Sequence, residues 1–558
     1  MDKVIILLVI FGLLAAVIII GKVMEKNKER DFRKKLNRDF DKPLSKEYSR
    51  ERKQSINGYF LRHADDCFVL DDITWNDFEL DRFIKTFNHS YSSVGDEYYY
   101  ARLRMPKISA EDCDFERLEE VIRYFSEDEK LREDYQVLMA KLGRSGKFSL
   151  YSYLDFLSAI PSDKPVITII DWLLYLASIG MMFFSGLFYL GLILLILLVI
   201  VNIIVYLSRI RRIEPYFASF TYILRIIKTA EKTVKRLPDS FRIEKEKLIG
   251  ARKKLSKIST ANIVFLQSDN SSAVGDMGNG LLSFFKMFFQ FDIFLFYRMK
   301  KQIENHGDAV DDLFETLGFL DFGVNVLSFR RTLQYYSVPE FIDQCGIHTT
   351  EMVHPLLLSD GVANSISTEK GVLLTGSNAS GKSTFLRMIG LNAVLAQSLH
   401  TVYAKEYTAP LYRVYSSMSI RDNLESGESY YMAEIKSIKR ILDAIQDESG
   451  PVLCFVDEVL RGTNTKERIA AGAEIMRSMQ QKHTICFAAT HDLELASILV
   501  PEFENYHFDE EIKDDDILFP YQLKKGYATS RNAIALLRIM GYPEDIVSNA
   551  LENAGMGE

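Results

Sequence analysis

Two long apolar stretches stand out from the alternation of apolar and polar residues along the chain. Val4–Ile20 is a run of 17 residues without a charge, at the short end of the length that spans a bilayer. No small-residue cleavage site follows it, and Lys22–Arg38 is charged, so we predict an uncleaved anchor rather than a cleavable signal peptide. Val166–Leu207 has 42 residues with Asp171 as its one charge. That length predicts two spanning helices joined by a tight turn near Ser185–Gly186.

Basic residues set the expected orientation of these three spans. A group of them follows the first span at Lys22–Lys35, and Arg209, Arg211 and Arg212 follow the third. The positive-inside rule then predicts an inner-membrane protein whose N-terminus is outside and whose residues 22–165 and 208–558 are in the cytoplasm. Asp171 falls near the predicted interface, where a carboxylate that reaches toward water is a simpler interpretation than a transport site.

The soluble parts show two kinds of periodicity. Apolar residues recur at helical spacing through Phe78–Phe87 and Leu118–Phe125, so residues 46–160 read as mostly helical. Residues 208–340 read as long helices interrupted by a polar loop at Ser268–Gly280. Leu281–Tyr297 is rich in phenylalanine but carries charges, which favours a packed or membrane-surface helix over a fourth span.

From Gly371 onward, short β-rich runs alternate with helical patterns, as in an α/β domain. The expected strands are Gly371–Thr375, Val452–Val456 and Thr484–Ala489. The net charge of −8 does not favour binding of DNA through bulk charge. The five cysteines show no metal-ligand spacing, and we interpret them as reduced thiols, with Cys454 and Cys486 inside buried strands.

A phosphate-binding loop follows the first of these strands. A strand-like GVLLT precedes the segment, and a helical FLRMIGLNAVLAQ follows it. Glycines let such a loop curl its N–H groups toward phosphate oxygens, Lys382 should reach the β- and γ-phosphates, and the Ser383 hydroxyl should bind Mg²⁺. The residues that fit this Walker A pattern are Gly376, Ser377, Asn378, Ala379, Ser380, Gly381, Lys382 and Ser383, with Thr384 next to them.

Two acids end the second strand, about 75 residues after Lys382. This Walker B arrangement predicts that Asp457 holds Mg²⁺ and that Glu458 orients or deprotonates the attacking water. His491 follows two residues after the third strand, where it could sense the γ-phosphate through a hydrogen bond. Lys382, Glu458 and His491 are therefore the candidate catalytic residues, and ATP and Mg²⁺ are the expected substrate and metal.

Several segments resemble the MutS family of DNA mismatch repair ATPases. The loop TGSNASGKST resembles the family's TGPNMGGKST, with Ser377 and Ser380 as departures. Asp422–Glu434 resembles the signature DDLxxGxSTFMxEM, and Arg461–Thr465 resembles GRGTST with Leu460 in place of its first glycine. ATHDLEL around His491 resembles ATHYFEL.

Weaker similarity extends on both sides of this region. His354-Pro355 stands where the family has RHP, Asn88–Pro106 resembles a stretch of the family's core domain, and residues 525–550 resemble the C-terminal region that helps the family form dimers. The resemblance implies a homodimer in which Ser429 reaches the ATP of the opposite subunit. It implies that Asn378 and Lys382 contact nucleotide and that His491 is the switch histidine.

The resemblance also implies DNA binding, although the domain that reads mismatches in the family has no counterpart that we recognise here. The core-like region begins near residue 65, and Phe125–Glu127 and Phe508–Glu510 match the Phe-x-Glu wedge in the wrong domains. Residues 22–53 carry 13 Lys/Arg against seven acids, and residues 209–257 carry 15 against five. Both flank predicted spans, so anionic lipid is the first explanation for their charge and DNA the second.

These observations predict a multi-domain chain with a helical core or lever domain, an α/β P-loop ATPase domain of the ABC class and three transmembrane helices. The expected function is a membrane-anchored MutS-like ATPase linked to mismatch repair; a nucleotide-gated membrane scaffold without a DNA role is the alternative. An ABC transporter is disfavoured because we find no LSGGQ-like signature. The expected segments are an anchor at 1–21, a basic linker at 22–64, the first core part at 65–165, a hairpin at 166–207, the second core part at 208–345 and the ATPase domain with dimerisation helices at 346–558.

Overall fold

The computed structural model describes most of the chain. The described residues are 2–44, 47–65, 67–160, 166–184, 186–213, 216–256, 258, 289–377, 380–418, 430–447, 449–460, 463–481, 483–513, 516–528, 537–538 and 541–553. Side chains are described for these residues except 2–18, 166–168, 217–219, 291–292, 430, 511–513 and 516–517. The expected loop at Ser268–Gly280 and the first half of the expected helix at Leu281–Tyr297 lie outside the described residues.

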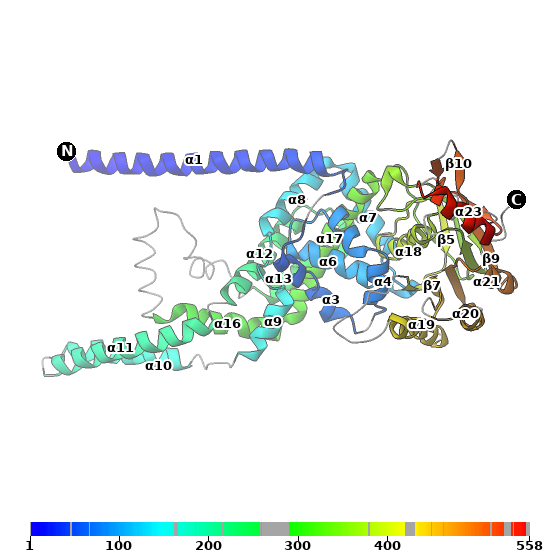
Figure 1. The fold of residues 1–558 in the computed structure, drawn as a ribbon. Helices are drawn as coiled ribbons and strands as arrows, with labels where there is room; N and C mark the ends of the chain where they lie inside the picture. The colour runs from blue at the N-terminus through cyan, green and yellow to red at the C-terminus, as the bar shows by residue number, and fades with distance from the viewer. Residues whose placement is uncertain are drawn as a thin grey trace.

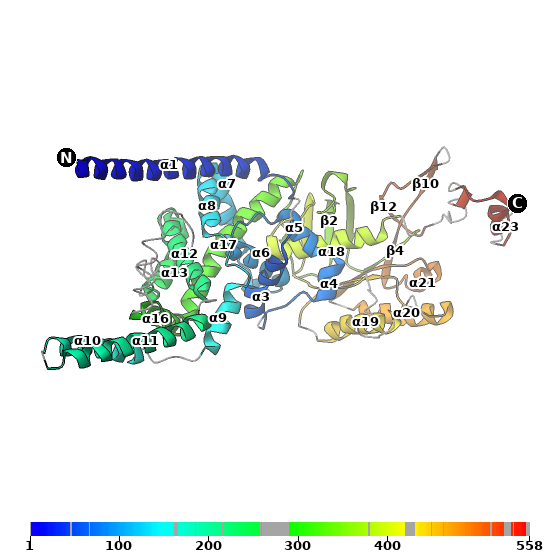
Figure 2. The same cartoon turned by 60° about the vertical axis from the view of Figure 1, so that its left-hand side comes forward.

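The molecule is elongated and has three parts (Figure 1). A helical body occupies the middle, and an α/β domain lies at one end of it. From the other end project α1 (Asp2–Asp39) and a hairpin of α10 (Val166–Met182) and α11 (Phe188–Ile213), which point in the same direction in both ribbon views (Figures 1 and 2). The expected division into a helical region and a C-terminal α/β region is therefore present.

The helical body is built around α17 (Gly307–Thr332), which is buried along most of its length. Other elements enclose it, because α6, α7, α8, α12 and α13 pack against it. The helices of the body are α2 (Arg50–Ser55), α3 (Gly58–His63), α4 (Asp72–Asp77), α5 (Leu80–Phe87), α6 (Ser93–Arg104), α7 (Phe115–Glu127), α8 (Glu129–Leu142), α9 (Leu150–Ala159), α12 (Phe217–Val234), α13 (Arg242–Lys254) and α16 (Phe291–Asn305).

The last part of α1 is fixed to the body by charge pairs. Arg33 Nη2 of α1 lies 2.6 Å from Asp134 Oδ1 of α8. Glu29 Oε2 of α1 lies 2.7 Å from Lys141 Nζ of α8. Leu36 is buried. The expected anchor at residues 4–20 falls in the first half of α1, and its side chains up to residue 18 lie outside the described residues.

The hairpin corrects one expectation. Among the described residues, one helix, α11, is long and apolar enough to cross a membrane, while the apolar stretch of α10 at Ile169–Met182 is shorter than a span of that kind. Three transmembrane helices are therefore not supported. The turn is where the apolar run predicts it, between Met182 and Phe188; Ser185 lies outside the described residues.

Polar contacts join the base of the hairpin to the start of α16. Trp172 Nε1 donates to the carbonyl of Phe289 across 2.8 Å, and Arg209 Nη1 donates to Gln290 Oε1 across 3.1 Å. Gln290 Nε2 also donates to the amide oxygen of Asn202. The described part of Leu281–Tyr297 forms the start of α16, with Ile293 and Phe296 buried, so it packs against the body as expected.

The α/β domain holds two main sheets. The larger has six strands in the order β12-β9-β4-β8-β7-β6, all parallel except β12. Its strands are β4 (Gly371–Thr375), β6 (Arg413–Ser417), β7 (Val452–Asp457), β8 (Thr484–Ala489), β9 (Phe503–Phe508) and β12 (Leu523–Lys525). The three predicted strands are thus β4, β7 and β8, and Cys454 and Cys486 face each other as buried partners in β7 and β8.

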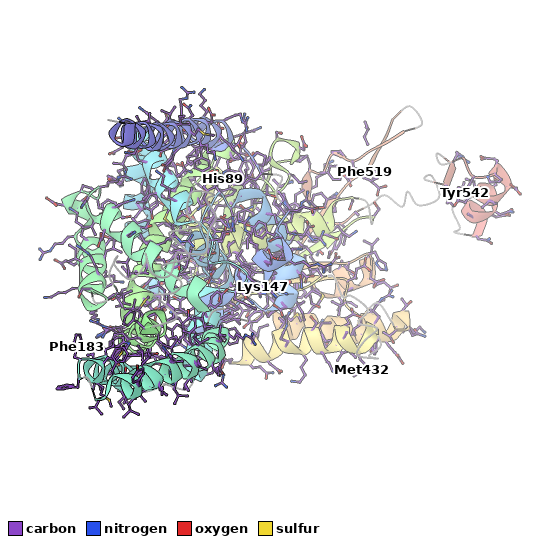
Figure 3. The ribbon with its side chains drawn as sticks, turned by 90° about the vertical axis from the view of Figure 1, so that its left-hand side faces the viewer. His89, Lys147, Phe183, Met432, Phe519 and Tyr542 are labelled. Atoms are coloured by element: carbon purple, nitrogen blue, oxygen red, sulfur yellow. The ribbon has the colours of Figure 1, made fainter. Side chains whose placement is uncertain are left out.

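A four-stranded sheet and several helices complete this domain. The sheet has the order β1-β5-β2-β3, and its first strand lies just before residue 346. The remaining elements are β1 (Glu340–Phe341), β2 (Ile347–Met352), β3 (Asn364–Thr368), β5 (Glu406–Ala409), β10 (Glu511–Lys513), β11 (Asp516–Leu518), α18 (Lys382–Leu399), α19 (Tyr430–Gln446), α20 (Thr465–Met479), α21 (Leu493–Ile498) and α23 (Glu544–Asn553). Figures 2 and 3 show α23 and Tyr542 standing apart from the sheet.

Candidate nucleotide-binding site

The loop between β4 and α18 has the backbone that the glycines predict. Gly376 has φ +136° and Gly381 has φ +102°, a region that side chains disfavour. A Cβ at Gly376 would lie 3.0 Å from the carbonyl oxygen of Phe508, so the loop also passes close to another strand. Asn378 and Ala379 lie outside the described residues.

Two side chains of this loop meet oxygen atoms at the sheet edge. Lys382 Nζ donates to the carbonyls of Gly376 and Ser377, at 2.7 and 2.5 Å. Ser383 Oγ donates to Asp457 Oδ2 across 2.5 Å. The structure therefore brings together the hydroxyl of the phosphate-binding loop and the first acid of the Walker B strand, which are 74 residues apart.

Strand register explains how the second acid reaches the histidine. Ala489 of β8 pairs with Asp457 on one side and with Leu374 on the other, so the ends of three strands form one row. The Glu458 N–H donates to the carbonyl of Ala489 across 2.9 Å. His491 Nδ1 lies 3.3 Å from Glu458 Oε1, and the histidine side chain is half exposed. Glu458 has φ +60°, a conformation that is costly for a residue with a side chain.

The structure describes only some residues of the two segments that resemble the family signature and the loop after Walker B. Ser429 and the rest of residues 419–429 lie outside the described residues, as do Arg461 and Gly462. Leu460, which replaces a family glycine, has φ +59°. Asn464 caps α20 by accepting from the Lys466 N–H across 3.1 Å.

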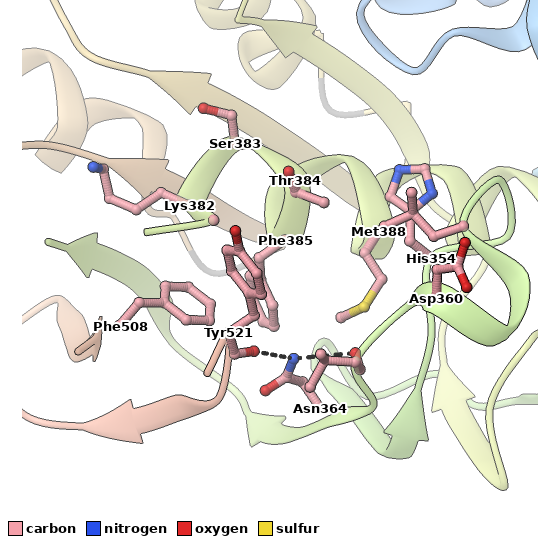
Figure 4. Close-up of a pocket in the computed structure, with 13 residues that line it drawn as sticks. His354, Asp360, Asn364, Lys382, Ser383, Thr384, Phe385, Met388, Phe508 and Tyr521 are labelled. Atoms are coloured by element: carbon pink, nitrogen blue, oxygen red, sulfur yellow. Dashed lines mark hydrogen bonds between the residues drawn. The ribbon is translucent and has the colours of Figure 1, made fainter. Parts of the chain in front are cut away.

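A cavity of about 340 Å³ opens beside the phosphate-binding loop (Figure 4). Gly381, Lys382, Ser383 and Thr384 form one side of it. His354, Phe508 and Tyr521 contribute larger side chains from other segments, and Met388 contributes one from α18 (Figure 4). Burial lowers the pKa of His354 to about 4, so this ring is neutral near pH 7.

Tyr521 is held over the phosphate-binding loop by an asparagine. Asn364 Nδ2 donates to the Tyr521 carbonyl across 3.0 Å, and Asn364 Oδ1 accepts from the Leu523 N–H across 2.7 Å. A Cβ at Gly381 would lie 2.8 Å from the Tyr521 ring, so the ring packs directly on this glycine. The sequence reasoning missed Asn364 and Tyr521, because they come from separate segments without a shared motif, and Met388, which lies on α18 beyond the phosphate-binding motif.

The oxygen atoms at the strand ends fit Mg²⁺. This ion prefers hard oxygen ligands and is usually held by one or two carboxylates together with substrate phosphates. Ser383 and Asp457 supply a hydroxyl and a carboxylate that already converge. Among the described residues, no group of three or more His, Cys, Asp or Glu side chains forms a closed metal cage, and a site shared with phosphate does not need one.

Comparison with known proteins agrees with these motifs. The sequence model of MutS domain V matches residues 372–556. MutS protein homolog 4 of Homo sapiens is 31% identical over 275 residues, which are 46% of this chain and 28% of that protein. DNA mismatch repair protein MutS of Thermus aquaticus is 28% identical over 261 residues, 46% of this chain and 31% of that protein. The chain thus spans less than a third of the length of these relatives.

The matched region contains the phosphate-binding loop, the paired acids and His491. These are the segments whose side chains the sheet brings to one edge. Residues 372–556 therefore match domain V of the MutS family, and MutS proteins are the relatives that this part of the chain resembles.

Proposed function

We propose that the chain is a MutS-type ATPase that binds and hydrolyses ATP with Mg²⁺, works as a homodimer and is attached to a membrane. The observation that carries the enzymatic part is the convergence at the ends of β4, β7 and β8. There Ser383 Oγ is 2.5 Å from Asp457 Oδ2, and Glu458 is beside His491. A hydroxyl, two carboxylates and a lysine at the start of a helix are the parts that phosphoryl transfer to water requires.

Each side chain has a distinct role in this proposal. Lys382 exchanges its bonds with the Gly376 and Ser377 carbonyls for the β- and γ-phosphates. Ser383 and Asp457 would hold Mg²⁺, which supplies charge neutralisation to the phosphates. Glu458 orients the attacking water and accepts its proton, and His491 senses the γ-phosphate from beside Glu458.

The cavity beside the loop suits the rest of the nucleotide. Its volume of about 340 Å³ lies in the range of small-molecule pockets. Tyr521, Phe508 and Met388 offer apolar surface to a flat base, and neutral His354 does not repel it. The proposed pose puts the phosphates on the loop and the base between these side chains.

The homodimer is proposed from the resemblance of Asp422–Glu434 to the family signature. In this arrangement Ser429 of each subunit reaches the ATP of the other, so each site needs both subunits. ATP binding would close the dimer and hydrolysis would release it.

Membrane attachment is proposed from the hairpin and α1. The apolar part of α11, residues 188–207, would be roughly 30 Å long at 1.5 Å per residue, which equals a hydrocarbon core. Exposed apolar side chains such as Phe183, Tyr189 and Ile193 line the hairpin, and Phe183 points outward at its tip (Figure 3). We propose an inner-membrane location, an N-terminus outside and a cytoplasmic ATPase domain.

DNA is a second candidate partner, favoured by the names of the relatives, which include DNA mismatch repair protein MutS. The basic stretches 22–53 and 209–257 are its proposed contacts. Several of their bases are paired with acids of the same chain: Arg52 with Asp96, Arg252 with Glu231, and Lys254 with Asp308. Pairing of this kind reduces the positive charge that is left to bind DNA phosphates. It therefore favours the alternative of a nucleotide-gated membrane scaffold without a DNA role.

Turnover of the Glu458→Gln variant tests the enzymatic proposal. We expect the variant to bind ATP as the wild type does and to hydrolyse it at least 100-fold more slowly, by about the contribution of a general base. Equal turnover would refute the assignment of Glu458. Binding of the full chain to homoduplex and mismatched DNA, titrated with salt, tests the second candidate; no binding at low salt would exclude it.

A further inference from the structure

Glu434, on α19, contacts the loop that follows the paired acids. Its Oε1 accepts a hydrogen bond from the Leu460 N–H across 2.6 Å. Glu434 is 2% exposed and Leu460 is 4% exposed. The contact therefore links the first turns of α19 to the end of the Walker B segment, inside the protein.

The conformation of Leu460 makes this contact matter. Both Glu458 and Leu460 lie in the left-handed region, with φ of +60° and +59°. A side chain makes this conformation costly, whereas glycine adopts it freely. A carboxyl oxygen that accepts from the Leu460 N–H stabilises the costly conformation, because this buried N–H would otherwise be left without an acceptor, which is unfavourable inside a protein.

The backbone is held at Glu458 and after it. The Glu458 N–H donates a hydrogen bond to the Ala489 carbonyl, and Val459 and Leu460 are buried in the apolar cluster that includes Ile438 of α19. With the backbone held at these points, the direction of the Glu458 side chain toward His491 depends on the path of the backbone through Leu460.

We propose that Glu434 is a positioning residue for hydrolysis, which holds Leu460 in the left-handed conformation and thereby aims Glu458 at the attacking water. The proposal rests on the ATPase function proposed above. It adds a residue that neither touches nucleotide nor belongs to the phosphate-binding or Walker B motifs.

The first experiment uses the full-length protein in detergent and compares Glu434→Ala, Glu434→Gln and Asp443→Ala. Steady-state kcat and KM, equilibrium binding of a fluorescent ATP analogue and Tm are measured for each. We expect Glu434→Ala to lower kcat about tenfold, the fold-change that matches the cost of a left-handed residue, with nucleotide affinity and KM unchanged. Glu434→Gln keeps an oxygen acceptor and should retain most of the turnover. Asp443, exposed on the same helix and paired with Lys439, is the matched control and should leave kcat unchanged.

The second experiment adds Leu460→Gly to Glu434→Ala. Glycine adopts the left-handed conformation without help, so kcat should recover toward the wild-type value. The same change removes a buried leucine and should lower Tm. Recovery of kcat while Tm falls is a result that a merely structural role of Glu434 does not produce. Leu460→Asn, which also tolerates this conformation, serves in place of Leu460→Gly if the glycine variant does not fold.

Two results would overturn the proposal. One is an unchanged kcat in Glu434→Ala. The other is a loss of kcat, nucleotide affinity and Tm together, without recovery in the double variant. If the wild type binds the analogue but shows no turnover, the proposed ATPase function fails and the role of Glu434 fails with it; normal wild-type turnover with an unchanged Glu434→Ala removes only the positioning role.

Discussion

The carboxylate of Asp77 accepts a hydrogen bond from the hydroxyl of Ser416, with 2.7 Å between the two oxygen atoms. Asp77 ends α4 of the helical body, and Ser416 lies in β6 of the α/β domain. The same carboxylate oxygen accepts from the Met418 N–H across 2.9 Å, and Asp77 is 1% exposed. A buried acid of the body thus fixes the end of a strand in the α/β domain.

Asp77→Ala should destabilise the protein, because it leaves two buried donors without their acceptor. We expect the free energy of unfolding to fall by about 1–3 kcal/mol, measured by chemical denaturation. Asn76→Ala is the control, since Asn76 is the exposed neighbour on the same helix. Equal stability of the two variants would contradict the role of this contact.

Lys382→Met should weaken nucleotide binding. A hydrogen bond to a charged group contributes about 1.5–3 kcal/mol, so the Kd for ATP should rise by roughly 10- to 100-fold. Isothermal titration or a fluorescent analogue measures this change. Lys405→Met removes an exposed lysine that pairs with Glu351 and should leave Kd unchanged. If Lys382→Met held nucleotide as tightly as the wild type, the proposed site would be wrong.

Asp321 gives a prediction about pH. Burial raises the pKa of Asp321 from 3.8 to about 7, and the hydrogen bond from Ser90 offsets only part of this rise. The folded protein therefore holds the proton more tightly than the unfolded chain. The protonated side chain of Asp321 therefore stabilises the folded protein fully below pH about 4, and this stabilisation is lost as pH rises toward about 7.

Asp321→Asn removes this titration while keeping an oxygen acceptor for Ser90. The Tm of the variant relative to the wild type should therefore rise between pH 5 and pH 8. Thermal unfolding at several pH values in this range measures the difference. A difference in Tm that does not depend on pH would show that Asp321 does not titrate there.

The hairpin predicts membrane behaviour. A charge near the bilayer centre costs roughly 2.5–3.5 kcal/mol on insertion scales, and Ile193 and Leu197 are exposed on α11. Changing both to lysine should move protein out of the membrane fraction after carbonate extraction. Leu61→Lys, at an exposed apolar position of α3, should have no such effect. Unchanged partitioning of the double variant would count against a hairpin in the bilayer.

Local patterns predicted the central strands and the residues at their ends. β4, β7 and β8 have the expected starts, because a continuous apolar run bounded by polar residues is a local signal. The contact of Ser383 with Asp457 also follows from sequence, since parallel strands end at one edge of a sheet.

Contacts between distant segments could not be predicted in this way. Asp77 and Ser416 are 339 residues apart, and neither belongs to a motif. The left-handed conformation of Leu460 has only an indirect signal, the family glycine that it replaces. Among the described residues the second expected span is too short, because α10 ends at Met182 and its apolar stretch begins at Ile169. Hydropathy shows where a chain is apolar but does not show where turns and packing end a helix.

The helix α17 has a mechanical consequence for the whole molecule. Its 26 residues make a strut of about 39 Å at 1.5 Å per residue. One end lies beside α16, which is bonded to the hairpin, and at the other Arg330 donates to His400 and Thr401 of the α/β domain. From Thr316 to Arg330 every residue of this helix is buried. The base of the apolar hairpin and the α/β domain, though far apart, are thereby connected through one buried helix.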